Sequence, residues 1–247
     1  MVILKLSKIV HFMESDFPKA TIRIVGTSHV AKESVRRITT AYDALQPDIV
    51  CVELDPPRLR ALQDEALGKK QPSISPSMIR VVGISGYVFA LIARAVQKKI
   101  GNVLNVKPGL DMLEAINLAK KDQKQLFLID QRIDITLRRF SQKFTFCEKL
   151  RVLSDVIFGP FQKQKIKIDL RKIPDEKMID EFMEILRQRY PSIYEVLIIE
   201  RNIVMARNLD GIVRKHPGAK ILVVIGAGHG KDLRERLKLM ERIADIT

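Results

Sequence analysis

Two copies of one short pattern, an apolar run followed by Gly-x-x-His, constrain the fold of this 247-residue chain most strongly. In the first copy an Ile- and Val-rich run over residues 21–25 ends at Gly26, and His29 follows three residues later. Near the C-terminus, Gly226 and His229 occupy the same positions after another such run. Each copy predicts a strand that ends at a glycine and leads into a helix. Strand–helix units at both ends of a chain are typical of α/β domains with a parallel sheet.

Two more strands are predicted inside the chain. Residues 48–54 and 125–129 form short continuous apolar runs, which are typical of strands buried on both faces. Apolar residues at helical spacing predict helices near the strands, over residues 32–45, 57–67, 112–121 and 231–243.

The whole chain therefore reads as one α/β domain over residues 1–247. We expect a mixed, largely parallel sheet that is formed by the N- and C-terminal portions and flanked by helices. The remaining chain, roughly residues 68–124 and 133–216, is expected to form an inserted helical cap or a flank of the sheet.

Carboxylates also follow the predicted inner strands, Glu53 after one and Asp130 after the other. Because the carboxyl ends of parallel strands meet at one edge of a sheet, we expect these carboxylates to lie near His29 and His229. Imidazole nitrogens and carboxylate oxygens are common ligands of divalent metals. The pattern predicts a metal site from these four residues, and hydrogen-bonded structural histidines are the alternative.

Two arginines are candidates for binding a substrate anion, because a guanidinium holds a carboxylate or phosphate through two parallel bonds. These are Arg132, close to Asp130, and Arg201, which lies within an apolar helical stretch. A structural role is equally open: Arg201 or Arg132 would form an ion pair with Glu53 or Asp130 and join a helix to the sheet.

Other chemistries fit the sequence less well. Thr27 and Ser28 are not part of a Gly-x-Ser-x-Gly nucleophile motif, and the glycines around His229 lack the Gly-x-Gly-x-x-Gly spacing of dinucleotide-binding loops. The chain has 43 Lys and Arg against 29 Asp and Glu, a formal net charge of +14, which favours anionic partners or a solvated basic surface. Since it has no basic motif interleaved with aromatics and no zinc-finger spacing, nucleic acid is not an expected partner.

The expected compartment is the cytoplasm. No secretory signal precedes the first strand, and Cys51 and Cys147 fit no redox spacing. Residues 78–96 are mostly apolar but carry Arg80 and Arg94, which leaves too short an uncharged stretch for a regular membrane span. We expect a helix there that is buried or lies at the surface, where it could support membrane-surface association or a homo-oligomer.

The motifs together resemble those of a known family. Six segments match, in order, the TraB/PrgY (pheromone shutdown) family: IVGTSHVAKESV, DIVCVELDPPRL, VKPGLDM, LIDQRIDITLRR, IERNIVMARNL and VVIGAGHG. The likeness extends over residues 21–240. That family is related to the TIKI membrane metalloproteases and more distantly to erythromycin esterase and ChaN-like proteins.

The resemblance implies a mixed α/β fold and, from the TIKI-like members, metal-dependent peptide hydrolysis at two Gly-x-x-His motifs and a glutamate. The matching residues in this chain are His29, His229 and Glu53. Asp130, Arg132 and Arg201 are matching charged positions. Relatives often have a glutamate after the Pro-Gly turn where this chain has Asp111. Many prokaryotic members continue into a C-terminal membrane region, which would make a longer natural protein membrane-associated.

Two main functional hypotheses follow. In the first, the chain is a metal-dependent peptide hydrolase in which His29 and His229 hold Mn, Co or Zn, and Glu53 is a ligand or the general base. Arg132 or Arg201 would stabilise the charge that develops on the substrate. In the second, it binds or sequesters a peptide signal without turnover. A third, weaker hypothesis is a basic adaptor that docks on anionic surfaces through its net charge.

Overall fold

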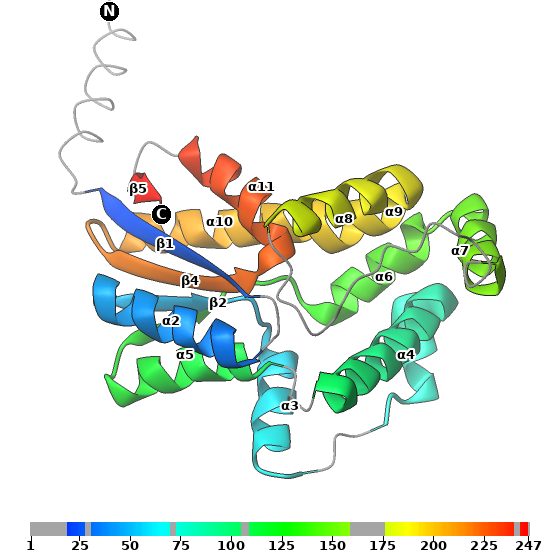
Figure 1. Cartoon of the computed structure of the whole chain (residues 1–247), viewed down its shortest axis with the longest axis horizontal. Helices are drawn as coiled ribbons and strands as arrows, with labels where there is room; N and C mark the ends of the chain where they lie inside the picture. Colours follow the sequence, from blue (N-terminus) through cyan, green and yellow to red (C-terminus); the bar gives the residue numbers. More distant parts are fainter. Residues whose placement is uncertain are drawn as a thin grey trace, which may run out of the picture.

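The chain folds around a parallel β-sheet (Figure 1). The structure is a computed structural model that describes residues 19–27, 31–69, 73–104, 109–158, 176–239 and 243–246. In these ranges five strands are arranged in the order β3-β2-β4-β1-β5, and each neighbouring pair is parallel. The strands are β1 (Ala20–Thr27), β2 (Ile49–Val52), β3 (Gln125–Leu128), β4 (Lys220–Gly226) and β5 (Ile243–Ile246). The predicted α/β fold with a largely parallel sheet is confirmed.

Helices cover both faces of this sheet. On one face, α2 (Ala31–Leu45) and α5 (Leu110–Lys121) bury a core with β2 and β4. On the other face, α10 (Glu200–Lys215) and α11 (Ala227–Lys238) bury a second core with β1 and β4. The chain leaves β1 through α2 toward β2, and leaves β4 through α11 toward β5. The connections that leave the adjacent strands β1 and β4 therefore run to opposite faces of the sheet. Open α/β sheets bind ligands at the carboxyl ends of two such strands.

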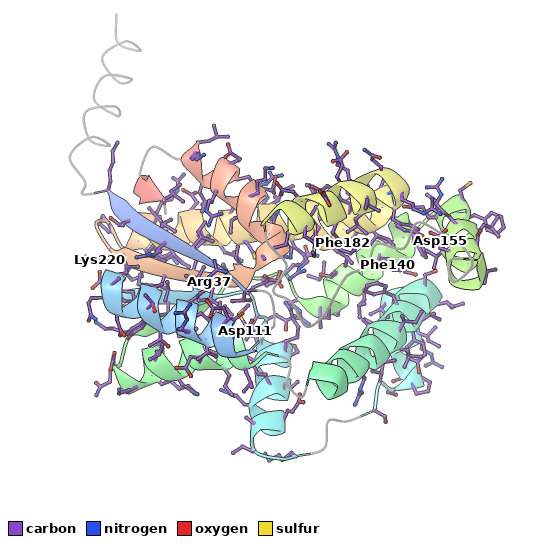
Figure 2. All side chains as sticks on the ribbon, viewed as in Figure 1. Arg37, Asp111, Phe140, Asp155, Phe182 and Lys220 are labelled. Atoms are coloured by element: carbon purple, nitrogen blue, oxygen red, sulfur yellow. The ribbon has the colours of Figure 1, made fainter. Side chains whose placement is uncertain are left out.

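The ranges expected to form a cap or flank contain both kinds of helix. Both α5 and α10 fall inside those ranges, and they pack on the sheet. The helices away from the sheet gather at one end of the molecule (Figure 1). Figure 2 labels Phe140 and Asp155 among them. They are α4 (Ile79–Leu104), α6 (Ile133–Lys143), α7 (Phe146–Phe158), α8 (Glu176–Arg189) and α9 (Pro191–Tyr194), with the π-helical turn η3 (Glu195–Ile199) leading into α10. Helix α3 (Pro56–Ala66) and the short η1 (Pro76–Met78) connect β2 to α4.

The C-terminal boundary differs from the prediction. A helix was expected over residues 231–243, but α11 begins directly after Gly226 and ends at Lys238. Ile243 instead begins β5, which extends the sheet beside β1. The predicted helix included only the first residue of this strand, and a run of four residues is too short to distinguish a strand from a helix by periodicity. His229 consequently lies within the first turn of α11.

Candidate functional site

The carboxyl ends of β2, β3 and β4 bring three of the expected side chains together. Glu53 directly follows β2, and its N–H donates to the Val224 carbonyl of β4 at 3.0 Å. Asp130 follows β3 and its N–H donates to the Leu54 carbonyl at 3.3 Å. His229 is the third residue of α11, which begins directly after β4, and its Nε2 lies 3.4 Å from Glu53 Oε1.

Arg201, in the first turn of α10, joins these three side chains. Its Nε and Nη2 donate to the two oxygens of Asp130 at 3.0 and 2.6 Å, and Nη2 also donates to Glu53 Oε1. Its Nη1 donates to the Leu197 carbonyl at 3.2 Å and to His229 Nε2 at 3.1 Å. A guanidinium has five N–H donors, and these contacts occupy all five. Arg201 therefore holds the cluster together and has no free donor for a substrate.

The tautomer of His229 follows from its neighbours. Asn202 Nδ2 donates to the Asp232 carboxylate at 2.7 Å, which points the Asn202 carbonyl oxygen at His229 Nδ1, also at 2.7 Å. Nδ1 must then carry the proton, because that oxygen only accepts. Nε2 is left as the unprotonated nitrogen and accepts from Arg201. A ring held through its second nitrogen is the usual arrangement of a functional histidine.

Burial and charge set the protonation states in this cluster. Burial lowers the pKa of His229 more than the nearby Glu53 charge raises it, and Arg201 adds to the lowering. Burial by itself would raise the pKa values of Glu53 and Asp130. At Glu53 the charge of His229 in its protonated form, followed by that of Arg201, outweighs burial and lowers the pKa. At Asp130 the hydrogen bonds and charge of Arg201, with a contribution from Arg58, lower the pKa. At neutral pH the cluster therefore holds a neutral imidazole beside ionised carboxylates.

The sequence did not point to Arg58 or Asp55, which complete the cluster. Arg58, on α3, donates to Asp130 Oδ2 at 2.5 Å and to the Gln131 carbonyl at 3.3 Å. Asp55 caps α3 by accepting from the Arg58 N–H at 2.8 Å, and it also accepts from the Ile133 N–H at 2.5 Å. The Asp-Pro-Pro segment that starts α3 is a recognisable capping signal. No comparable signal marks Arg58, because its role depends on how α3 packs.

The other predicted residues lie apart from this cluster or outside the described ranges. Arg132 is exposed and pairs with Asp134 at 3.0 Å. The sequence left open whether Arg132 or Arg201 pairs with a carboxylate at the sheet, and in the structure Arg201 pairs with Asp130. Glu200, next to Arg201, pairs instead with Arg139 at 2.6 Å. His29 lies outside the residues that the structure describes.

Both motif glycines lie at the site. The N–H of Gly226 donates to Glu53 Oε2 at 2.5 Å and so fixes the carboxylate from the β4 side. At Gly26 a Cβ would lie 3.3 Å from Ala227 Cα, so its missing side chain leaves room for the start of α11 beside β1.

The described residues alone do not fit the expected Mn, Co or Zn ion. Within the described ranges no group of three or more His, Cys, Asp or Glu side chains is placed to hold a metal. The expected ligand atoms of His229, Glu53 and Asp130 already accept hydrogen bonds from Arg201. A divalent cation there would face the positive guanidinium at short range. A metal site at this edge would need His29.

Sequence comparison places this cluster in a family. The profile of the TraB/PrgY/gumN family matches residues 13–241, a range that includes every residue of the cluster. The chain belongs to the TraB/PrgY/gumN family. The resemblance drawn from the six sequence segments is thereby confirmed at the level of the family.

Relatives of this TraB/PrgY/gumN member occur in archaea and animals. The uncharacterized protein MJ1365 of Methanocaldococcus jannaschii is 30% identical over 228 residues, which cover 91% of this chain and 55% of that protein. The human TraB domain-containing protein is 25% identical over 235 residues, covering 84% of this chain and 60% of that protein. The mouse protein of the same name is 24% identical over 230 residues. The chain thus spans little more than half the length of these relatives.

Proposed function

We propose that this chain is a hydrolase whose reactive centre is the pair formed by His229 and Glu53. One observation carries the proposal: a buried, neutral histidine has its tautomer fixed by Asn202, and its Nε2 lies 3.4 Å from an ionised glutamate. The pair lies at the carboxyl edge of a parallel sheet, where such folds bind ligands. A peptide as the substrate rests on the resemblance to the TIKI metalloproteases.

In this proposal His229 Nε2 is the general base. It takes a proton from a water molecule that replaces the Arg201 contact, and the resulting hydroxide attacks the carbonyl carbon of the substrate. The protonated imidazole then donates to the leaving amine. The cluster has three carboxylates, Glu53, Asp55 and Asp130, against two guanidiniums. A proton on His229 therefore brings the net charge of the cluster to zero, and the Glu53 carboxylate stabilises that proton.

Arg58 rather than Arg201 is suited to meet a substrate anion. The Arg58 side chain is 29% exposed, whereas that of Arg201 is 14% exposed and has all its donors engaged. The anchoring of Arg58 by Asp130 and Asp55 would hold its guanidinium at the rim of the cluster. Substrate charge would be bound there, and Arg201 would keep the base and the carboxylates in position.

A peptide-cleavage assay tests the proposal. The parent and the variants His229→Gln and Glu53→Gln are incubated with a defined peptide mixture, and products are followed by mass spectrometry. Loss of the general base in His229→Gln, or of the charge that stabilises its protonated form in Glu53→Gln, should reduce turnover by about a hundredfold or more. Arg132→Ala is the matched control, because this arginine pairs with Asp134 at the surface, and it should retain the parent rate. Equal cleavage by His229→Gln and the parent would contradict the proposal.

The metal-dependent form of the hypothesis needs a separate measurement, because it depends on His29. Elemental analysis of the purified parent is compared with that of a His29→Ala/His229→Ala variant, after addition of Mn, Co and Zn. Near-stoichiometric metal that is present only in the parent would support a site shared by both motifs. Metal in neither protein would favour the reaction without a divalent ion.

A second candidate is peptide binding without turnover, and the observation that favours it is that every N–H donor of Arg201 already has a protein acceptor. Because all five of its donors have protein acceptors, the cluster is satisfied without a ligand. This candidate predicts saturable peptide binding, unaffected by chelators, with no cleavage products after long incubation.

A further inference from the structure

Helix α4 has two faces of different character. One face packs closely on α6: a Cβ at Gly86 would lie only 2.4 Å from the Leu137 carbonyl oxygen. Val82, which precedes a kink in α4 at the non-helical Gly83, is fully buried. On the same face the rings of Phe89 and Phe140 lie 4.4 Å apart between centroids, and Figure 2 labels Phe140. This face is accounted for by packing within the chain.

The other face of α4 is apolar and exposed. Ile84 is 71% exposed and Ile92 55%, and Val88 and Leu91 between them are also exposed. Positions separated by four, seven and eight residues lie on one side of a helix. Among the described residues, Pro76–Ala95 is long and apolar enough to cross a membrane by length and composition, yet only 11% of its most apolar window is buried. A core helix of a soluble protein would have this stretch mostly buried.

The sequence segment that contains α4 carries formal charge of one sign only. Residues 66–110 contain no Asp or Glu but seven Lys and Arg, so this segment supplies +7 of the net charge of +14. The seven are Lys69, Lys70, Arg80, Arg94, Lys98, Lys99 and Lys107. On α6, the exposed Arg138 donates to the Val81 carbonyl at 3.2 Å and adds a further cation beside α4. An exposed apolar helix face in a segment whose charged residues are all basic is complementary to an anionic lipid surface.

We propose that the exposed face of α4, defined by Ile84, Val88, Leu91 and Ile92, docks on the surface of a membrane that contains anionic lipids. The apolar side chains would enter the boundary between headgroups and acyl chains, while Arg80 and Arg94 pair with lipid phosphates. The helix lies in the plane of the surface rather than across the membrane. Its other face is packed on α6, which carries several charged side chains.

A second copy of the chain is a poorer partner for this face. In a two-fold symmetric dimer the same patch faces itself, so the acid-free segments of both copies would meet and place like charges together. Anionic headgroups neutralise these charges instead. This inference is independent of the proposed hydrolase activity.

Vesicle sedimentation tests the inference with the intact chain. The parent should sediment with vesicles of phosphatidylcholine and phosphatidylserine, bind pure phosphatidylcholine more weakly, and lose the difference at high salt. Ile84→Asp/Ile92→Asp should reduce binding about tenfold or more, because charges replace the inserted side chains. Arg80→Glu/Arg94→Glu should abolish the preference for phosphatidylserine.

Leu239→Asp is the matched control, because Leu239 is 85% exposed but follows α11, and its variant should bind as the parent does. Circular dichroism shows whether each variant is folded. The inference is wrong if the parent stays in solution with both kinds of vesicle, or if Ile84→Asp/Ile92→Asp sediments as strongly as the parent. A dimer that these substitutions dissociate, without vesicle binding, would assign the face to a second copy.

Discussion

Asp232 accepts a hydrogen bond from Asn202 and in this way determines which nitrogen of His229 carries the proton. Removing its carboxylate in Asp232→Ala leaves the Asn202 amide free to rotate, so that Nδ1 is no longer the required donor. We expect the 15N chemical shifts of the His229 ring to change from a single tautomer with Nδ1 protonated to a mixture. If the chain is a hydrolase, turnover should fall by about 10- to 100-fold.

The matched control for this prediction is Asp210→Ala. Asp210 pairs with Arg214 one helical turn away on α10, as Asp232 pairs with Arg236 on α11, but the Asp210–Arg214 pair lies at the surface. Asp210→Ala should therefore leave the His229 resonances unchanged. Identical spectra for Asp232→Ala and the parent would show that another group fixes the tautomer.

At this scale the sequence predicts residues that follow strands better than residues on helices. Glu53, Asp130 and His229 could be expected together, because their strands are recognisable as apolar runs and parallel strands share a carboxyl edge. The sequence left open whether Arg132 or Arg201 reaches them. That depends on how α6 and α10 pack, which no local pattern specifies. Asn202 was missed for the same reason.

At the scale of elements, the close approach of α4 to α6 depends on Gly86. A Cβ there would meet the backbone of Leu137 at 2.4 Å, so Gly86→Ala must push the helices apart. We expect the free energy of unfolding to fall by about 1–3 kcal/mol, as in other overpacked sites. Urea denaturation followed by circular dichroism measures the change.

Gly211, on α10, provides the opposite case. A Cβ at this helical position would meet nothing within 4 Å, so Gly211→Ala should raise the free energy of unfolding by about 0.5–1 kcal/mol. Opposite signs from the same substitution would support the packing at Gly86. A Gly86→Ala variant as stable as the parent would show that α4 does not pack on α6 at this distance.

Which helices cover the sheet was harder to predict than which segments are helical. The apolar periodicity of α5 and α10 shows that each has a face to bury, but it does not say against what. The sequence therefore left open whether they belong to a cap or to a flank, and the structure packs them on the two faces of the sheet. The boundary between α11 and β5 was missed because a four-residue strand is too short to show a period of two.

At the scale of the whole molecule, the charged cluster ties separate parts of the fold together. Arg201 links α10 to the ends of β2 and β3, and Arg58 links α3 to the end of β3. Breaking such a buried network leaves uncompensated charge, which costs about 3–5 kcal/mol. Protonation of this cluster should therefore change the free energy of unfolding of the whole domain and not only the stability of one local segment.

The direction of its pH dependence follows from the pKa shifts. His229 has a pKa below its usual 6.5 in the folded state, so the unfolded chain takes up the proton first on acidification. The contribution of His229 to stability is complete above pH 6.5 and is lost as the pH falls from there through the lowered pKa. Glu53 and Asp130, whose usual pKa values are 4.5 and 3.8, are also lowered, and their contributions are lost in a second decline at more acidic pH.

Urea unfolding of the parent and of His229→Gln at a series of pH values from 8 to about 4 tests this order of events. Below pH 6.5 the free energy of unfolding of the parent should fall more steeply than that of the variant, by up to about 1.4 kcal/mol per pH unit. The reason is that the unfolded parent binds one proton on His229 that the folded parent does not. Both proteins should then decline together once the carboxylates take up protons. Parallel curves between pH 8 and pH 5 would mean that His229 titrates alike in the folded and unfolded chains. Burial would then not hold the imidazole neutral, and its assignment as the base would lose its physical support.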